Sequence, residues 1–338
     1  MNGIKNDPPI GLGLISGGLD SLIACLVLKL QNIEVIGLNF KSPFCICDKA
    51  YQNAECGLNL YDKLGIKTYF LQKEDDYLEV IKNPKFGYGK NLNPCIDCRI
   101  YILKKAKLFA EKINVDFIFT GEVIDQRPKS QNLKALRIIE EESNLKGKLL
   151  RPLSALMLKP TILEEKGLID RSRLLGIKGR SRKKQLELAR THGILNEYNA
   201  CGGCLLTEKE FANRMRDYLK FNNKPTMDGV SLLKYGRHFR FNGAKIIVGR
   251  NELENNFLVH LKGSNGIIME ASNVKGPITL IQGNIDATVI KIAARLTLRY
   301  SDAIKPQGEV KYGRGSNILN EYLTVEKATQ EFLTPYLL

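Results

Sequence analysis

A short stretch near the N-terminus carries residue types that bind nucleotide phosphates. Residues 16–21 read Ser-Gly-Gly-Leu-Asp-Ser, between an apolar run and an apolar helix. The glycines have no Cβ, so the backbone can approach a ligand closely, and the first N–H groups of the helix favour phosphate. The serine hydroxyls can donate to phosphate oxygens, and the carboxylate suits the magnesium that accompanies a nucleotide. The predicted nucleotide contacts are Ser16, Gly17, Gly18, Asp20 and Ser21; the alternative is an ordinary Gly-Gly turn.

Two Cys-x-x-Cys pairs form a second group of reactive residues. They are Cys95 with Cys98, at the start of a predicted helix whose dipole stabilises thiolate, and Cys201 with Cys204. The pairs lie too far apart in sequence for a zinc ribbon, so the fold must bring them together. Three interpretations stay open. A [4Fe–4S] cluster can sit on three thiolates and leave one iron open to sulfide. A structural zinc would use all four thiolates. A persulfide mechanism would use one cysteine from each motif as nucleophile and resolver.

Three more cysteines lie in a loop after the second predicted strand. They are Cys45, Cys47 and Cys56. A metal role is one interpretation. The other is that they are buried small residues, as free cysteines commonly are.

The charge of the chain indicates a polyanionic partner. Of its 338 residues, 51 are Lys or Arg and 36 are Asp or Glu, which gives a formal net charge of +15. Such an excess favours nucleic acid. Residues 179–185 concentrate cations in the first turn of a predicted helix, where they oppose the macrodipole. We therefore expect Arg180, Arg182 and Lys183 to contact RNA phosphates; the alternative is a solvated helix face.

The elements that must position these residues alternate between strand and helix patterns. Apolar runs predict strands over about 11–15, 35–40, 67–71 and 116–122, and helices over 22–30, 58–64 and 100–113. This alternation predicts an α/β fold with a doubly wound, mainly parallel sheet. Ligands of such sheets bind beyond the carboxyl ends of the strands, so Gly121 is expected to lie beside the phosphates.

The pattern changes near residue 225. Short alternating runs with Gly and Asn turns predict strands over 238–241, 245–248, 257–260, 267–269 and 278–281, and a helix over about 286–300. We therefore expect two domains, a nucleotide-binding domain over 1–225 and a smaller α+β domain over 226–338.

The sequence gives no sign of a membrane partner. It contains no apolar run of membrane-spanning length, and its N-terminus does not read as a signal peptide. We therefore expect a cytoplasmic protein, in which eight cysteines serve as thiols or metal ligands rather than as disulfides.

Residues 10 to about 220 resemble the tRNA-thiolating branch of the PP-loop ATP pyrophosphatase superfamily, which includes the tRNA 2-thiouridine and 4-thiouridine synthases. Besides residues 16–21, the matching motifs are Asn-Pro-Cys-x-x-Cys at 93–98, Thr-Gly-Glu-x-x-x-Gln-Arg-Pro at 120–128, Gly-Arg-Ser-Arg-Lys at 179–183 and Gly-Gly-Cys-Leu-Leu-Thr at 202–207. The resemblance implies that Cys95, Cys98 and Cys204 are the family cysteines, while Cys201 lies outside the motif.

The same resemblance implies ATP as the nucleotide. It places adenine near the backbone after the second strand, so Leu38 and Phe40 are candidate contacts. Residues 237 to about 315 look like the RNA-binding domain of the fibronectin-binding-like ribosome quality-control family, on the motif Val-Gly-Arg-Asn-Glu-x-Glu-Asn at 248–255. This likeness implies that Arg250 contacts RNA.

The implied function is ATP-dependent sulfur insertion into a tRNA base, with Asp20, Cys98 and Cys204 as catalytic residues. The implied cofactors are ATP, Mg²⁺ and a [4Fe–4S] cluster, with zinc as the alternative. The partners would be tRNA and a sulfur donor, either sulfide or a persulfide carrier. Two other functions stay open: a non-thiolating, zinc-containing PP-loop ligase or amidase acting on a small molecule, and an RNA-binding protein with a vestigial ATPase half.

Overall fold

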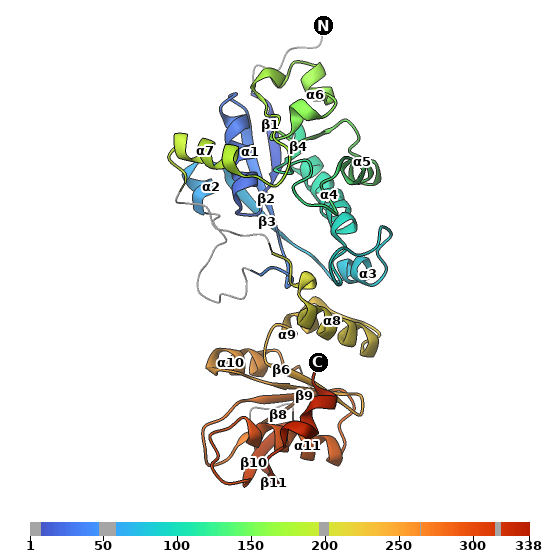
Figure 1. Cartoon of the computed structure of the whole chain (residues 1–338), viewed down its shortest axis with the longest axis vertical. Coiled ribbons are helices and arrows are strands. Elements are labelled where there is room, and N and C mark those ends of the chain that lie inside the picture. The colour runs from blue at the N-terminus through green and yellow to red at the C-terminus, as the bar shows by residue number, and fades with distance from the viewer. Residues whose placement is uncertain (1–7, 47–58, 196–202, 264, 315–318) are drawn as a thin grey trace. The chain divides into compact units, whose positions relative to one another are not determined.

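In a computed structural model, the chain divides into two compact units, Met1–Thr207 and Glu208–Leu338 (Figure 1). The structure describes residues 8–46, 59–195, 203–263, 265–314 and 319–338. Each unit has its own sheet and its own apolar core.

The N-terminal unit is built on a five-stranded sheet in which every neighbouring pair is parallel. In the order β3-β2-β1-β4-β5, its strands are β1 (Ile10–Leu14), β2 (Glu34–Lys41), β3 (Lys67–Gln72), β4 (Phe117–Thr120) and β5 (Leu149–Leu150). The chain leaves β1 in one direction to build β2 and β3, and later returns on the other side of β1 to build β4. The crevice beyond β1 and β4 is therefore the switch point at which such sheets bind ligands.

Helices cover both faces of this sheet, as a doubly wound fold requires (Figure 1). The helices are α1 (Leu19–Lys29), α2 (Asn59–Lys63), α3 (Asp76–Lys82), α4 (Cys95–Lys112), α5 (Leu133–Glu142), α6 (Ile162–Glu165) and α7 (Lys183–Thr191). One core joins a sheet face to α1 and α7 through residues such as Ile23 and Ala189. The other joins the opposite face to α4 and α5 through Leu103 and Ile139. The predicted α/β fold is confirmed.

Strand β1 alternates leucine with glycine for a packing reason. Leu12 is fully buried in the core on the α4 side. On the other face, a Cβ on Gly13 would lie 2.5 Å from the ring of Phe119, and a Cβ on Gly11 would lie 2.6 Å from the ring of Phe117. The two glycines thus make room for two aromatic rings of the neighbouring strand β4.

The C-terminal unit is an antiparallel sheet with helices. Its strands, in the order β11-β10-β8-β9-β7-β6, are β6 (Arg237–Phe241), β7 (Ala244–Val248), β8 (Ile267–Ala271), β9 (Thr279–Gln282), β10 (Gln307–Arg314) and β11 (Glu321–Glu326). Its helices are α8 (Lys209–Phe221), α9 (Met227–Leu232), α10 (Glu252–His260), α11 (Ala287–Arg299) and α12 (Gln330–Leu333). Helix α11 contributes Val289 and Ala293 to the core against this sheet. The smaller α+β unit matches the expected class.

One predicted strand is wrong. Residues 257–260 form the end of helix α10 rather than a strand. The local reason is a cap: Asn251 accepts a hydrogen bond from the Glu254 N–H at 2.9 Å, and acidic residues fill the first turn. Capping and the helix dipole therefore outweigh the strand preference of the run Phe-Leu-Val-His. The sequence pattern also did not reveal β10 and β11.

The division between the units falls before α8, whereas the sequence pattern changes after it. Helix α8 packs with the second unit because Asp217 forms ion pairs with Arg240 at 2.6 Å and with Lys245 at 2.8 Å. A change in composition cannot reveal such long-range pairing.

Across the residues that the structure describes, we find no helix with both the length and the apolar character needed to cross a lipid bilayer.

Candidate functional site

The loop between β1 and α1 forms the first part of the site. Gly17 has φ of 76°, a left-handed conformation that favours glycine. The Ser21 hydroxyl donates to the Gly18 carbonyl at 2.9 Å and lies 2.9 Å from the Tyr61 hydroxyl. It also accepts from the Ser16 N–H at 3.3 Å. Within the described residues no side chain caps α1, so its first N–H groups can receive an anion.

Gly121 lies directly against this loop. A Cβ at this position would be 2.6 Å from the Ser21 nitrogen and 2.7 Å from the Asp20 carbonyl carbon. The end of β4 therefore presses backbone to backbone on the start of α1. The structure brings these two predicted site segments together.

The two predicted adenine contacts differ in position. Leu38 is fully buried, and its carbonyl accepts from the Ile15 N–H at 3.0 Å. Phe40 is half-buried near the carboxyl end of β2. Between them, the Asn39 amide donates to the Ile15 carbonyl at 2.9 Å and ties β2 to the loop. The expected backbone contacts from Leu38 to Phe40 include Asn39, but the sequence assigned no role to its side chain.

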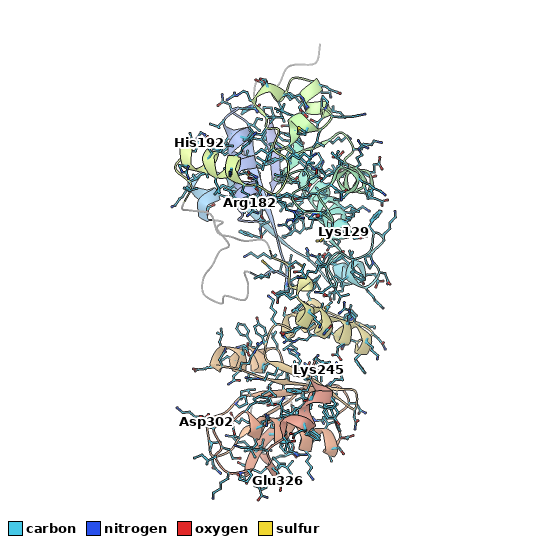
Figure 2. The ribbon with its side chains drawn as sticks, viewed as in Figure 1. Lys129, Arg182, His192, Lys245, Asp302 and Glu326 are labelled. Atoms are coloured by element: carbon cyan, nitrogen blue, oxygen red, sulfur yellow. The ribbon has the colours of Figure 1, made fainter. Side chains whose placement is uncertain are left out.

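Asp20 connects the loop to the basic segment at the start of α7. Its carboxylate accepts from the Gln185 amide at 3.1 Å and pairs with the Arg182 guanidinium at 3.4 Å (Arg182 is labelled in Figure 2). Gln185 is completely buried. Arg180 and Lys183 are exposed close by in sequence. The sequence analysis missed Gln185, which lies in the first turn of α7, three residues after the N-cap Arg182.

Three backbone hydrogen bonds hold the segment around Cys204 next to the loops that contain Cys45 and precede Cys95. Leu205 N–H donates to the Phe44 carbonyl at 2.8 Å, and Ile46 N–H donates to the Gly203 carbonyl at 3.3 Å. Leu92 N–H donates to the Leu206 carbonyl at 3.1 Å. The segment around Cys204 is thus held between the loop after β2 and the loop before α4.

Cys95, Cys98 and Cys204 meet in this way. Besides burial, Cys98 raises the pKa of Cys95, and both Cys98 and Cys95 raise the pKa of Cys204, so the three side chains lie near one another around the start of α4. Cys201, Cys47 and Cys56 lie outside the described residues. Over the part of the chain that the structure describes, no group of three or more His, Cys, Asp or Glu side chains is arranged to hold a metal ion.

Cys98 differs electrostatically from its two neighbours. Burial acts to raise its pKa, but the Lys73 ammonium, the Tyr77 hydroxyl and Arg99 together hold the pKa below that of an ordinary thiol. The Lys73 Nζ donates to the Cys98 Sγ at 3.1 Å. This favours the thiolate, which is the reactive form. The sequence analysis missed Lys73 because it follows β3, far from the cysteine motif.

The other two thiols keep their protons more firmly. Burial and the neighbouring Cys98 raise the pKa of Cys95. Burial raises the pKa of Cys204 to about 12. Of the three thiols, Cys98 is therefore the one that loses its proton most readily.

The motif at 120–128 joins the two halves of the site. The charge of Arg127 interacts with both Asp20 of the loop and Cys95 of the thiol cluster. Glu122, after β4, is buried and pairs with Arg151 at 3.0 Å and Arg99 at 3.3 Å. Burial acts to raise the pKa of Glu122, but these two guanidinium groups hold the pKa below its usual range.

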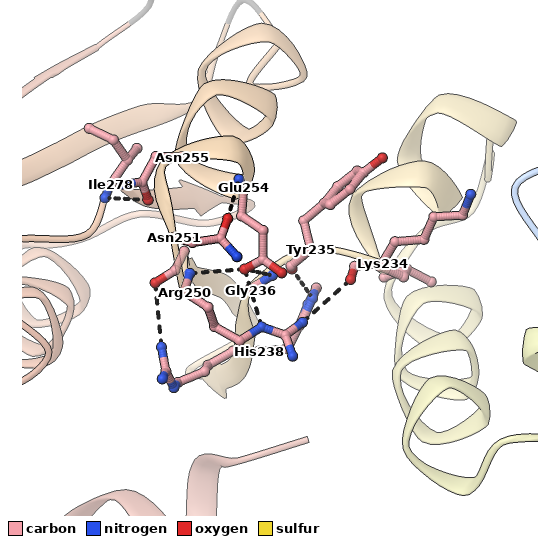
Figure 3. Close-up of polar contacts among 12 residues, drawn as sticks. Lys234, Tyr235, Gly236, His238, Arg250, Asn251, Glu254, Asn255 and Ile278 are labelled. Carbon is pink, nitrogen blue, oxygen red and sulfur yellow. Dashed lines mark hydrogen bonds and ion pairs between the residues drawn. The ribbon is translucent and has the colours of Figure 1, made fainter. Parts of the chain in front are cut away.

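Arg250 lies in the C-terminal unit, in a separate polar network (Figure 3). Its backbone N–H and its Nε donate to the Glu254 carboxylate at 2.9 and 3.1 Å, and an Nη group donates to the Lys234 carbonyl at 3.5 Å. The same carboxylate accepts from the Gly236 N–H at 3.1 Å. The arginine is thus held by its own loop while its side chain stays 41% exposed, which leaves it open to solvent.

The fold and the loop geometry define a PP-loop type of nucleotide domain, and comparison with known proteins gives its relatives. Residues 9–165 match the family model of the thiamine biosynthesis protein ThiI, and residues 236–337 match that of the NFACT protein RNA binding domain. The chain therefore joins a ThiI-type PP-loop domain to an NFACT-type domain. The predicted resemblance is confirmed for both domains.

Curated relatives include tRNA-specific 2-thiouridylases MnmA. The enzyme of Listeria welshimeri is 25% identical over 248 residues, which cover 70% of this chain and 63% of that protein. That of Coxiella burnetii is 24% identical over 232 residues, covering 65% and 59%. The chain thus spans less than two thirds of the length of these relatives.

Solved structures show weaker likenesses. A 4-thiouridine synthetase–RNA complex with bound ATP aligns at a TM-score of 0.40 and 17% identity, covering 67% of this chain and 52% of that one. The U34-tRNA thiolase NcsA from Methanococcus maripaludis with its [4Fe–4S] cluster aligns at 0.33 and 17%, covering 68% and 71%.

Proposed function

We propose that this chain is an ATP-dependent tRNA sulfurtransferase, which adenylates a base carbonyl oxygen and replaces it with sulfur. The observation that carries the proposal is the place of the motif at 120–128 between the two groups of residues. A Cβ on Gly121 would lie 2.6 Å from the Ser21 nitrogen, and Glu122 pairs at 3.3 Å with Arg99, the residue after Cys98. This supports a nucleotide site next to a sulfur site. The relatives named as tRNA 2-thiouridylases support the same activity.

In this proposal the loop at 16–21 binds the phosphates of ATP. The glycine backbone and the start of α1 receive phosphate oxygens, and the Asp20 carboxylate holds Mg²⁺. Arg127 and Arg182 then neutralise charge that develops on the α-phosphate as a base carbonyl attacks it. Adenylation is needed because oxygen leaves a carbonyl carbon poorly unless it is carried away as a phosphate ester.

The three cysteines would hold the sulfur that an external donor, sulfide or a persulfide carrier, supplies. Cys95, Cys98 and Cys204 are the residues that would hold a [4Fe–4S] cluster, because their sulfurs are soft donors beside the cations Lys73 and Arg99. Cys95 and Cys204, whose pKa values are raised, would lose their protons on binding the iron. Such a cluster, when bound, would supply an iron able to hold sulfide. The protein's own part is to keep the thiolates charged and to orient them toward the adenylated base.

A persulfide route is the second candidate, and the hydrogen bond from Lys73 to Cys98 favours it. A thiolate stabilised in this way can act as a nucleophile without a metal. Cys204 would carry the sulfane sulfur or would receive it from Cys98.

The RNA partner is proposed from charge and from the C-terminal domain. The exposed cations Arg180 and Lys183 lie at the start of α7, next to the nucleotide loop. The C-terminal unit, which matches the model of the NFACT protein RNA binding domain and contains the exposed Arg250, would add a second RNA contact. These features support tRNA as the substrate.

The test is a reconstituted reaction with the full chain, bulk tRNA, ATP, Mg²⁺ and sulfide under anaerobic conditions. Mass spectrometry of digested nucleosides should find a new thionucleoside, formed together with AMP and pyrophosphate. Asp20→Asn should lose all three products, whereas the exposed variant Lys166→Ala should keep them. Pyrophosphate release that needs no tRNA, with no thionucleoside, would instead indicate a ligase acting on a small molecule.

A further inference from the structure

We propose that Cys45 is a fourth thiol of the candidate site and acts as the resolving cysteine for sulfur carried on Cys204. The inference rests on the persulfide route of the proposed function. It adds a residue that lies outside both Cys-x-x-Cys motifs.

The backbone sets Cys45 directly opposite Cys204. The two residues form an antiparallel β-bridge between the loop after β2 and the segment before α8. The flanking hydrogen bonds run from Leu205 N–H to the Phe44 carbonyl at 2.8 Å and from Ile46 N–H to the Gly203 carbonyl at 3.3 Å. This pattern makes the cysteines a non-hydrogen-bonded pair, in which Cα atoms are typically about 4.5 Å apart.

Such a pair suits thiol–disulfide exchange. Side chains that are directly opposite in an antiparallel ladder point to the same face. A Cα separation of about 4.5 Å falls inside the range of roughly 4.4–6.8 Å that disulfides require. Both residues are cysteines that are not joined by a disulfide, and both are only partly buried. A bond between them needs no change in the backbone pairing.

Cys98 is the natural competitor for this role, since it belongs to the motif and its charge interacts with Cys204. The Lys73 ammonium at 3.1 Å makes Cys98 the more reactive thiol toward an incoming sulfur donor. Cys98 is, however, fixed to the first turn of α4, and no shared backbone pairing links it to Cys204 among the described residues. The backbone therefore favours Cys45 as the attacking thiol.

The chemistry balances without a further cofactor. In the first step, a sulfane sulfur donor converts Cys204 to the persulfide Cys204–Sγ–S⁻. The Cys45 thiolate attacks Sγ, the Cys45–Cys204 disulfide forms, and the terminal sulfur leaves with the bonding electron pair as sulfide. When that terminal sulfur is already bonded to a base carbon, the same attack releases the thiolated base. The two cysteines are oxidised, the sulfane sulfur is reduced, and an external dithiol restores the pair.

The pair can be tested without tRNA or ATP. Reduced full-length protein is charged anaerobically with inorganic polysulfide, desalted, and followed for released sulfide and for disulfide-linked peptides by mass spectrometry. Wild type should release sulfide in an amount equal to the Cys45–Cys204 disulfide formed. Cys45→Ser and Cys45→Ala should both keep the persulfide on Cys204. They should release sulfide no faster than protein that was never treated with polysulfide. Cys25→Ala, which removes a fully buried thiol of α1, should behave as wild type.

Three results would overturn the inference. They are a disulfide from Cys204 to Cys95 or Cys98 in place of Cys45, unchanged sulfide release in both Cys45 variants, or no sulfane sulfur on Cys204. The tRNA thiolation assay is scored separately. Thionucleoside formation together with any of these three results would reject the role of Cys45 and leave the proposed function standing. Sulfide release through Cys45 in a protein that never thiolates tRNA would uphold the thiol pair and reject the proposed function.

Discussion

The Lys73 ammonium donates a hydrogen bond to the Cys98 sulfur at 3.1 Å, and it also lies 4.1 Å from the centre of the Tyr77 ring. The lysine is thus fixed between an aromatic face and a sulfur. A cation in this place stabilises the thiolate more than the thiol. Cys98 is consequently the thiol of the cluster expected to react first.

Replacing Lys73 should remove this bias. Lys73→Met should raise the pKa of Cys98 and slow its alkylation by iodoacetamide at neutral pH about tenfold, as expected for a change of one pKa unit. Lys73→Arg, which keeps the charge, should retain most of the reactivity. Alkylation of Cys98, followed by peptide mass spectrometry over roughly pH 6–9, measures the shift. Equal alkylation profiles for Lys73→Met and wild type would show that Lys73 does not control this thiol.

Gly121→Ala should weaken nucleotide binding. The new Cβ would lie 2.6 Å from the Ser21 nitrogen, and backbone atoms cannot rotate away from it. We expect a loss of about 1–3 kcal/mol in stability, as for other overpacked sites, and a lower ATP affinity. Gly176→Ala is the matched control, because its Cβ would meet only ordinary contacts, 3.4 Å from Leu156. Calorimetric titration with ATP should separate the two variants; equal affinities would place the nucleotide away from β4.

Gln185→Leu should loosen Asp20 without removing a charge. It takes away the hydrogen bond of 3.1 Å to the carboxylate and keeps a side chain of similar volume in the same buried place. Loss of one hydrogen bond to a charged group is worth about 1.5–3 kcal/mol. The Mg²⁺ concentration needed for half-maximal pyrophosphate release should therefore rise at least several-fold. Gln185→Glu would place a second carboxylate beside Asp20, and an unaltered Mg²⁺ requirement in both variants would exclude this positioning role.

The cations at the start of α7 should act on RNA and on ATP to different degrees. Arg180→Ala and Lys183→Ala should weaken tRNA binding and reduce its salt dependence, with a slope change of about 0.7–0.9 for each RNA phosphate that is no longer neutralised. Arg182→Ala should also alter ATP binding, because Arg182 pairs with Asp20 at 3.4 Å. Filter binding at several salt concentrations, with Lys166→Ala as control, tests the first effect. A salt slope that stays the same in both variants would remove these side chains from the RNA surface.

The stability of the C-terminal unit should fall in acid through Asp217. Burial acts to raise the pKa of this carboxyl, but Arg240 and Lys245 hold it below the usual value. The unfolded state therefore binds the proton more readily. The contribution of ionised Asp217 to the free energy of unfolding is complete above about pH 4 and is lost as the pH falls through the lowered pKa. Asp217→Asn should destabilise the unit by about 3–5 kcal/mol and should abolish this acid dependence. Hydrogen exchange of the β6 and β7 amides between neutral and acid pH provides the measurement; an acid response that persists in the variant would assign the effect to another group.

The sequence predicted the parts of the site that are local. The run Ser-Gly-Gly-Leu-Asp-Ser forms the expected turn into a helix, because glycines and helix start are contiguous in sequence, although α1 begins at Leu19, inside the run, rather than at residue 22. The cysteines 95 and 98 lie in the first turn of α4, as the pattern indicated.

The parts that it could not predict depend on residues far apart in the chain. Lys73 reaches Cys98 across 25 positions, and Gln185 reaches Asp20 across 165. The bridge between Cys45 and Cys204 joins two loops, neither of which shows the alternating pattern of a strand in its sequence. No hydrophobic pattern encodes such contacts, because tertiary packing alone creates them. The strand predicted at 257–260 was wrong for a local reason, because the cap at Asn251 starts a helix that includes these residues.

The pairing of glycine with phenylalanine across β1 and β4 restricts how this protein can change. A Cβ on Gly13 would lie 2.5 Å from the Phe119 ring, so the two positions share one volume. Gly13→Ala should therefore be tolerated far better when Phe119 is shortened to leucine than when the ring is kept, and the two substitutions should show a coupling free energy of about 0.5–3 kcal/mol. Substitutions at these two positions are thus expected to occur together, with a larger residue at 13 accompanied by a smaller one at 119.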